Sequence, residues 1–254
     1  MRPALSALAI TAALILTVTA APAEMDRAKL AAAQKAAADF VKLAGNSART
    51  GKPPRQSDPK VDALLGTVFD TSAATSPEFS DLPRITQWLA NADRVGLVYM
   101  LAGTGTRNLA AARNPKIADR IARNIAEFQD EYGRFVDFQI ALAGFMLEAV
   151  RSKLDTASEK ERANRKFQAG FVQVAGGIAQ TVAGALSTFS TEGITGEWQR
   201  ARLEPLDALA PKVADVLPKE MREKLGEMTL EIGDQVSDPQ IKDRLKALAE
   251  RIAK

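Results

Sequence analysis

One stretch of the sequence gathers the side chains that could carry acid–base chemistry. Its members are Glu127, Asp130, Glu131, Tyr132, Arg134 and Asp137. Paired carboxylates serve as general acid and base in hydrolases, and they also bind calcium. However, Arg134 lies four residues after Asp130 and three before Asp137, and these spacings favour ion pairs along a helix. The stretch therefore predicts a charged helix surface, and a carboxylate-based hydrolase is the third of three functional hypotheses.

The composition removes several other kinds of chemistry. The chain has 254 residues, with no histidine and no cysteine. Zinc sites built on these residues, cysteine proteases, Ser-His-Asp hydrolases, haem ligation by histidine and iron–sulfur clusters are thereby excluded. Disulfides are excluded as well, so packing alone must stabilise the fold. We expect no catalytic residue, no cofactor and no metal site.

A second group of residues could bind an anion. Its members are Arg107, Arg113, Lys116, Arg120 and Arg123. The last three share one helix face at spacings of four and three, directly after a helix start at Asn114-Pro115. Cations at a helix N-terminus oppose the helix dipole, and a bound phosphate, carboxylate or acidic head group would relieve that conflict. The alternative is a solvated face that pairs with Asp119 and Glu127.

A third pattern concerns packing. Residues 167–191 carry no charge, and three glycines recur there at intervals of seven. Small side chains at this spacing form a groove in which another helix can lie close. The segment is therefore either the buried centre of a bundle or part of a membrane-inserting hairpin. The residues expected to pack against another helix are Gly170, Gly176, Gly177 and Gly184.

The elements that must position these residues are all predicted to be helices, because no segment alternates with period two for long enough to form a strand. The expected ranges are 24–43, 59–69, 82–102, 115–154, 158–189, 218–236 and 239–252, with a further helix from Trp198 that Pro205 and Pro211 split or kink. A capping box is expected at Thr156–Glu159. The sequence predicts an all-α multi-helix bundle, with the 115–154 and 158–189 helices as a long antiparallel hairpin forming its spine.

The chain is expected to have four parts. Residues 1–23 are predicted to be a signal peptide, since an apolar run ends in Ala21-Pro22-Ala23, and cleavage is expected near Ala23. An Ala-rich helix over 24–45 precedes a linker over 46–59, which carries three prolines and three basic residues. Residues 60–254 form the helical bundle domain.

The leading functional hypothesis is a non-enzymatic protein of the cell envelope, periplasmic or secreted, that binds a partner through helical surfaces. The partner is another envelope protein or a second copy of the chain. The alternative is a protein that engages anionic lipid or inserts the 115–190 hairpin into a membrane. The formal net charge of +3 is too small to indicate nucleic-acid binding.

Overall fold

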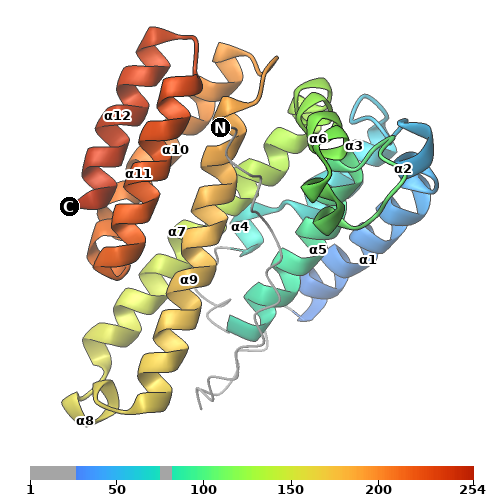
Figure 1. The fold of residues 1–254 in the computed structure, drawn as a ribbon. Coiled ribbons are helices and arrows are strands. Elements are labelled where there is room, and N and C mark those ends of the chain that lie inside the picture. Colours follow the sequence, from blue (N-terminus) through green and yellow to red (C-terminus); the bar gives the residue numbers. More distant parts are fainter. Residues whose placement is uncertain (1–26, 75–81) are drawn as a thin grey trace. The chain divides into compact units, whose positions relative to one another are not determined.

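The computed structural model describes residues 27–74 and 82–254, and these residues form helices and no strands (Figure 1). The predicted all-α class and bundle are thereby confirmed. The predicted signal peptide, residues 1–23, lies outside the described residues. The α-helices are α1 Arg27–Ala44, α2 Ser47–Thr50, α3 Pro59–Val68, α4 Thr71–Ala74, α5 Leu82–Met100, α6 Pro115–Glu127, α7 Gln129–Thr156, α8 Glu159–Arg162, α9 Arg165–Ser187, α10 Gly196–Val216, α11 Lys219–Gln235 and α12 Pro239–Ala253; two 3₁₀ helices are η2 Leu109–Arg113 and η3 Thr188–Ser190.

The helices divide into two compact units. Of the described residues, unit 1 holds those up to Phe138 together with 191–194, and unit 2 holds 139–190 and 195–254. This division differs from the predicted one, which set the 24–45 helix apart beyond a linker. Instead, α1 packs against α3 and α5 inside unit 1. Helix α7 contributes residues to both units, and the antiparallel hairpin as the spine of the fold stays a prediction.

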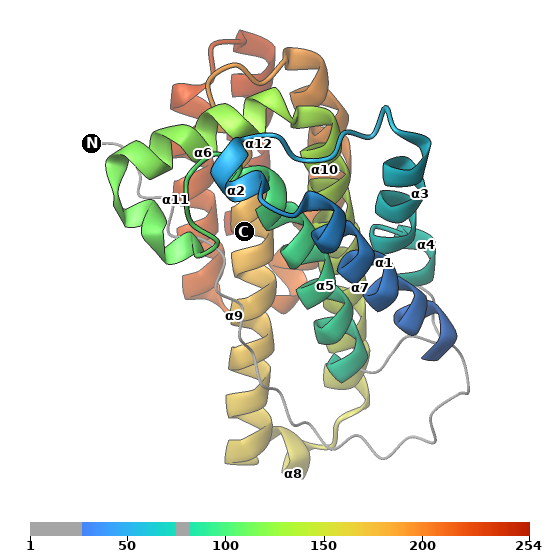
Figure 2. The ribbon, with the colours of Figure 1, turned by 90° about the vertical axis from the view of Figure 1, so that its right-hand side faces the viewer.

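In unit 1, α5 packs against α1 and α6, and Figure 2 shows α1 and α5 side by side. Aromatic side chains link these helices. The ring of Tyr99 lies 5.6 Å from that of Phe40 and 5.8 Å from that of Phe128, and all three are buried. Alanines on α1 are fully buried at Ala33 and Ala37, so this helix lies close to its neighbours. Such aromatic pairs stabilise a core beyond the area they bury.

The predicted 115–154 helix is wrong as a single element, because it breaks at Phe128 into α6 and α7. Phe128 leaves the helical conformation with φ −109° and ψ 30°. Its ring is buried against Tyr99, and the guanidinium of Arg55 lies 4.8 Å above it. Neither proline nor glycine lies at the break. We therefore attribute the break to the tertiary contacts of Phe128 rather than to the local sequence.

Most helices begin where the sequence predicts. Asp58, Asn114 and Asp238 each precede a proline and accept a hydrogen bond from the backbone two residues later. The predicted capping box is misplaced, because it forms between Ser158 and Glu161 rather than over Thr156–Glu159. Of the two alternatives for the helix from Trp198, the split is wrong, because α10 continues through both of its prolines.

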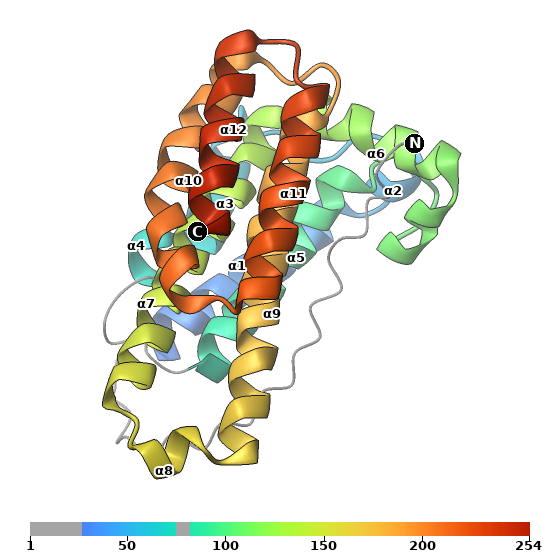
Figure 3. The ribbon, with the colours of Figure 1, turned by 60° about the vertical axis from the view of Figure 1, so that its left-hand side comes forward.

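In unit 2, α12 packs against α10 and α11, and α11 also packs against α9 (Figure 3). The close approach of α11 to α12 occurs at glycines. A Cβ atom at Gly226 would lie 3.2 Å from the carbonyl oxygen of Ala249 and from the Cβ of Ala253. A Cβ at Gly233, seven residues later, would lie 3.5 Å from that of Leu245. Helix α11 thus uses small residues at an interval of seven, which was expected of α9.

The glycines of α9 are packed less tightly than that pattern suggests. Gly184 is buried, whereas Gly170, Gly176 and Gly177 are half-buried. A Cβ at Gly176 would reach Met221 at an ordinary 3.9 Å, and one at Gly177 would meet no described atom of unit 2 within 4 Å. Gly177 therefore has room for a side chain within its unit.

Candidate functional site

All five predicted anion-binding residues lie in unit 1, but two of them have structural partners. Arg107 donates a hydrogen bond through Nη2 to the carbonyl oxygen of Gly45, directly after α1, at 2.7 Å. Arg120 donates through Nε to the carbonyl oxygen of Ala102, just beyond α5, at 3.3 Å. Carbonyl groups at a helix C-terminus carry partial negative charge, so a cation is favourable there. These two arginines therefore stabilise helix ends.

Arg120 also covers the place where two loops meet. Gly51 and Gly103 both have a φ near +70°, and a Cβ on either would lie 3.2 Å from Nη2 of Arg120. Backbone hydrogen bonds from Gly103 to Ser47 and from Gly105 to Ala48 join the same loops, at 3.0 and 2.8 Å. Glycine is required here by the positive φ and by the close approach. The contact brings the basic residues of 46–59 beside those of α6.

The contacts of Arg120 and the two loops thus bring together two segments of unit 1 that are distant in sequence, and each segment carries exposed cations. We define the basic surface as the exposed side chains of Arg49, Lys52, Arg113, Lys116 and Arg123. Across residues 27–74 and 82–254, none of the five side chains forms an ion pair or a hydrogen bond. Sequence reasoning missed Arg49 and Lys52, because residues 46–59 resemble a free linker. In fact Pro54 in this segment accepts a 3.1 Å hydrogen bond from the hydroxyl of Tyr99.

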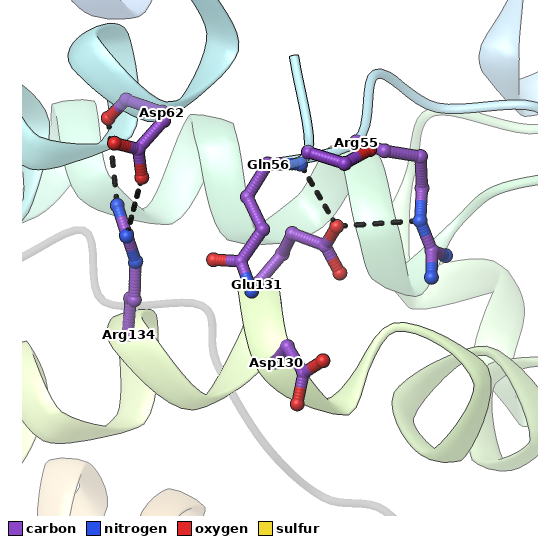
Figure 4. Close-up of a pocket in the computed structure, with 7 residues that line it drawn as sticks. Arg55, Gln56, Asp62, Asp130, Glu131 and Arg134 are labelled. Carbon is purple, nitrogen blue, oxygen red and sulfur yellow. Dashed lines mark hydrogen bonds and ion pairs between the residues drawn. The ribbon is translucent and has the colours of Figure 1, made fainter. Parts of the chain in front are cut away.

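The acidic stretch borders a separate polar cavity of about 390 Å³, also in unit 1 (Figure 4). Helix α7 supplies one wall, and α3 and the segment before it supply the other. The lining side chains are Arg55, Gln56, Ser57, Asp62, Asp130, Glu131 and Arg134. Three of them belong to the stretch predicted from sequence. The others come from residues 55–62, whose docking on α7 no local pattern indicates.

Glu131 is the most deeply buried residue of this lining, at 1% exposure. Its Oε1 accepts a 3.0 Å hydrogen bond from the backbone of Gln56 and lies 3.3 Å from Nε of Arg55. Its Oε2 is buried and receives no hydrogen bond from any residue in the described part of the chain. A buried acceptor left without a donor costs about 1–3 kcal/mol.

The two arginines of the cavity are already engaged. Arg55 pairs with Glu131, lies over the ring of Phe128 and donates to the carbonyl oxygen of Glu127 at 3.4 Å. Arg134 pairs with the carboxylate of Asp62 on α3 (Figure 4). The sequence instead suggested Asp130 and Asp137 as partners of Arg134, since they lie at helical spacing.

Tyr132 and Asp137 do not line the cavity, although the sequence placed them in the same acidic stretch. Tyr132 is buried and Asp137 is exposed. Burial and the charge of Asp93 on α5 raise the pKa of the Tyr132 hydroxyl above its ordinary value. Burial also raises the pKa of Asp93 itself, to about 7. Oδ1 of Asp93 has no hydrogen-bond partner among the described residues, and sequence reasoning did not select this residue.

Residues 27–74 and 82–254 contain no metal-binding cluster and one helical stretch that could span a membrane. No group of three or more carboxylates is arranged there to hold a metal ion. One helical stretch, Arg165–Ser190, is long and apolar enough to cross a membrane, with a mean hydropathy of 1.3 in its most apolar window. Only 44% of that window is buried, and Val172 within it is 50% exposed. Length and composition alone also fit the core helix of a soluble protein.

Comparison of the chain with protein-family models, with curated proteins and with solved structures finds no match. Function must therefore be inferred from the chemistry of the sites themselves. Two features of unit 1 have unsatisfied charge or hydrogen-bonding capacity, namely the basic surface and the cavity at Glu131.

Proposed function

We propose that this protein is a non-enzymatic binding protein of the cell envelope, and that its basic surface holds an acidic partner protein. The observation that carries the proposal is the gathering of five exposed cations that have no partner among the described residues. They come from residues 49–52 and 113–123, and Arg120 joins the two segments at Gly51 and Gly103. Complementary charge guides encounter and fixes the orientation of a partner.

The positive charge of the basic surface limits which partners can bind it. A second copy of the chain would present the same cations, so self-association through this surface is disfavoured by repulsion. The single carboxylate within residues 107–123 is Asp119, which also has an interaction of its own. Such a local excess of base suits a carboxylate-rich protein surface. The net charge of +3 is too small for the broad basic face that nucleic acid requires.

Poly-glutamate is a simple probe of this proposal. Binding of the full chain to labelled poly-glutamate is measured by fluorescence anisotropy at low and at physiological salt. We expect Lys116→Glu/Arg123→Glu to weaken binding by about tenfold or more, because two attractive charges become repulsive. Lys116 and Arg123 are suitable for reversal since neither side chain bonds a described residue, whereas reversing Arg107 or Arg120 would remove a helix cap.

The matched control is Lys166→Glu/Lys224→Glu, which makes the same change in net charge on exposed lysines of unit 2. It should leave binding nearly unchanged. Equal loss in both double variants would show that only total charge matters and would refute a defined surface. Cross-linking in native envelopes, followed by mass spectrometry, should then recover a protein with an acidic face from the wild type but not from the unit 1 variant.

A second candidate function is engagement of anionic lipid, and helix α9 is the observation that favours it. Its apolar composition and the exposed Val172 would suit contact with acyl chains. Flotation with phosphatidylglycerol vesicles tests this candidate. If lipid is the partner, Val172→Asp should reduce flotation and phosphatidylcholine vesicles should not replace the anionic ones. Absence of flotation at low salt would leave the protein partner as the sole proposal.

The envelope location rests on the apolar segment before Ala23. Intact mass measurement of the chain recovered from cells tests it, with cleavage near Ala23 as the expected result. Recovery of the uncleaved chain from the cytoplasm would remove the envelope from the proposal while leaving the basic surface unaffected.

A further inference from the structure

Glu131, which lines the cavity of unit 1, has one buried carboxylate oxygen that receives no hydrogen bond from the described residues. Oε1 of Glu131 is fully used, because it accepts from the Gln56 backbone and pairs with Arg55. Oε2 of the same carboxylate is buried and unpartnered among the described residues. Figure 4 shows this carboxylate at the centre of the lining, between Arg55 with Gln56 on one side and Asp130 on the other. An ionised carboxylate only accepts hydrogen bonds, so a group that satisfies Oε2 must be a donor.

The charges of the lining indicate that this donor is positive. The lining carries three carboxylates and two guanidinium groups. Both guanidinium groups are engaged, Arg55 with Glu131 and Arg134 with Asp62. The third carboxylate, Asp130, is exposed and forms no ion pair within the described part of the chain. The cavity therefore has one carboxylate more than its arginines neutralise.

We propose that this cavity binds an organic cation that bears N–H donors, such as a primary alkylammonium or an alkylguanidinium group, with Oε2 of Glu131 as the acceptor. Asp130 adds a second attractive charge at the same lining. A volume of about 390 Å³ lies at the small end of ligand sites and suits one such head group with a short alkyl chain. The group is either a free amine or the side chain of a lysine or arginine in a peptide.

The proposed site requires a hydrogen bond to Oε2 in addition to the electrostatic attraction that any cation would feel. A quaternary ammonium has the same charge as a primary one but no N–H donor, so it cannot satisfy Oε2. A divalent metal ion is a poor alternative, since the described residues offer no group of three carboxylates arranged for one. The site is separate in chemistry from the basic surface, and it can exist whether or not that surface binds an acidic protein.

The test is an NMR titration of the full chain that follows the backbone amides of Gln56 and Glu131. The probes are butylammonium, tetramethylammonium and a capped Gly-Lys-Gly peptide. We expect saturable shifts with butylammonium and weaker effects, by about tenfold, with tetramethylammonium. Tighter binding of the peptide than of butylammonium identifies a peptide side chain as the source, and the reverse order identifies a free amine.

Glu131→Gln should reduce butylammonium binding by about tenfold or more, because the amide is neutral and its nitrogen is a donor. The control Glu148→Gln removes an ion-paired carboxylate from unit 2 and should have no effect. If Glu131→Gln does not fold, Asp130→Asn is the substitute, since Asp130 is exposed; it should weaken binding by about two- to threefold. Equal binding of both ammonium probes, or no saturable binding with only an ordered water at Oε2 in a crystal grown with butylammonium, would overturn the proposal.

Discussion

The two units of the molecule treat charged groups differently. Unit 1 buries the carboxylate of Glu131 and leaves one of its oxygens without a donor in the described chain. Unit 2 keeps its carboxylates at the surface, where Glu148, Asp215 and Asp238 each pair with a cation on another helix. The polar residues that unit 2 buries are neutral threonines and glutamines.

Glycine is also used differently. In unit 1, Gly51 and Gly103 have positive φ and shape the loops beneath the basic surface. In unit 2, Gly226 and Gly233 lie within α11 and let α12 approach closely. Glycine thus permits close helix packing in α11 of unit 2 and positive φ in the loops of unit 1. Unit 1 also has a closely packed helical glycine, because a Cβ at Gly96 would lie 2.9 Å from the ring of Phe135.

Buried side-chain atoms without a hydrogen-bond partner among the described residues occur in both units, for example at Glu131 in unit 1 and at Gln139 and Arg222 in unit 2. We place function in unit 1 because it combines a buried carboxylate with the exposed cations of the basic surface.

Among the tests of this contrast, the largest effect is expected at Asp93, a carboxyl of unit 1 whose pKa is raised to about 7 by burial. Between its ordinary value of 3.8 and about 7, the folded state keeps the proton that the unfolded state releases. Folding is therefore favoured at low pH, and this contribution is lost as pH rises to about 7. Relative to Asp93→Asn, the wild type should lose at most about 4 kcal/mol of unfolding free energy over that interval.

Denaturant unfolding at a series of pH values measures this difference. The control is Asp215→Asn, which alters an exposed aspartate of unit 2 that pairs with Arg151 and should show no such fall. A carboxyl resonance of Asp93 that titrates near its ordinary value of 3.8 would contradict the expected shift.

The next largest effect should appear in unit 2 at Gly226. A valine there would place its Cβ 3.2 Å from the Ala249 carbonyl oxygen, and backbone cannot move aside as a flexible side chain can. We expect Gly226→Val to lower the unfolding free energy by about 1–3 kcal/mol and to speed hydrogen exchange in α11 and α12. The matched variant is Gly66→Val on α3, where a Cβ would meet no neighbouring atom of the described residues within 4 Å. Similar losses in both variants would mean that helix propensity, rather than packing, sets the effect.

A smaller effect of opposite sign is expected at Gly177. The sequence pattern makes this glycine a packing residue, so alanine should destabilise the protein. The structure leaves open space at its Cβ position within unit 2. Gly177→Ala should therefore raise the unfolding free energy, by up to about 1 kcal/mol, because alanine favours a helix more than glycine does. A loss of stability on denaturant unfolding would instead support the groove predicted for α9.

The sequence predicts features that depend on neighbouring residues better than features that depend on residues far apart in the chain. Helix starts at Asp58, Asn114 and Asp238 were predictable because a cap depends on neighbours in the chain. The break at Phe128 and the docking of Arg55 on Glu131 were not, since both depend on residues far apart in sequence. For the same reason, the acidic stretch predicted only one wall of the cavity, and the basic cluster predicted only part of the basic surface.

The smallest expected effect concerns the surface ion pair between Glu148 on α7 and Lys212 on α10. A double-mutant cycle of Glu148→Gln and Lys212→Gln should give a coupling free energy of about 0.2–1 kcal/mol, which salt reduces because both side chains face solvent. The same cycle at Arg55 and Glu131 should give a larger coupling with weaker salt dependence, since Glu131 is shielded from water. Equal couplings in the two units would mean that burying Glu131 gives its charge no special environment, and the contrast between the units would then fail.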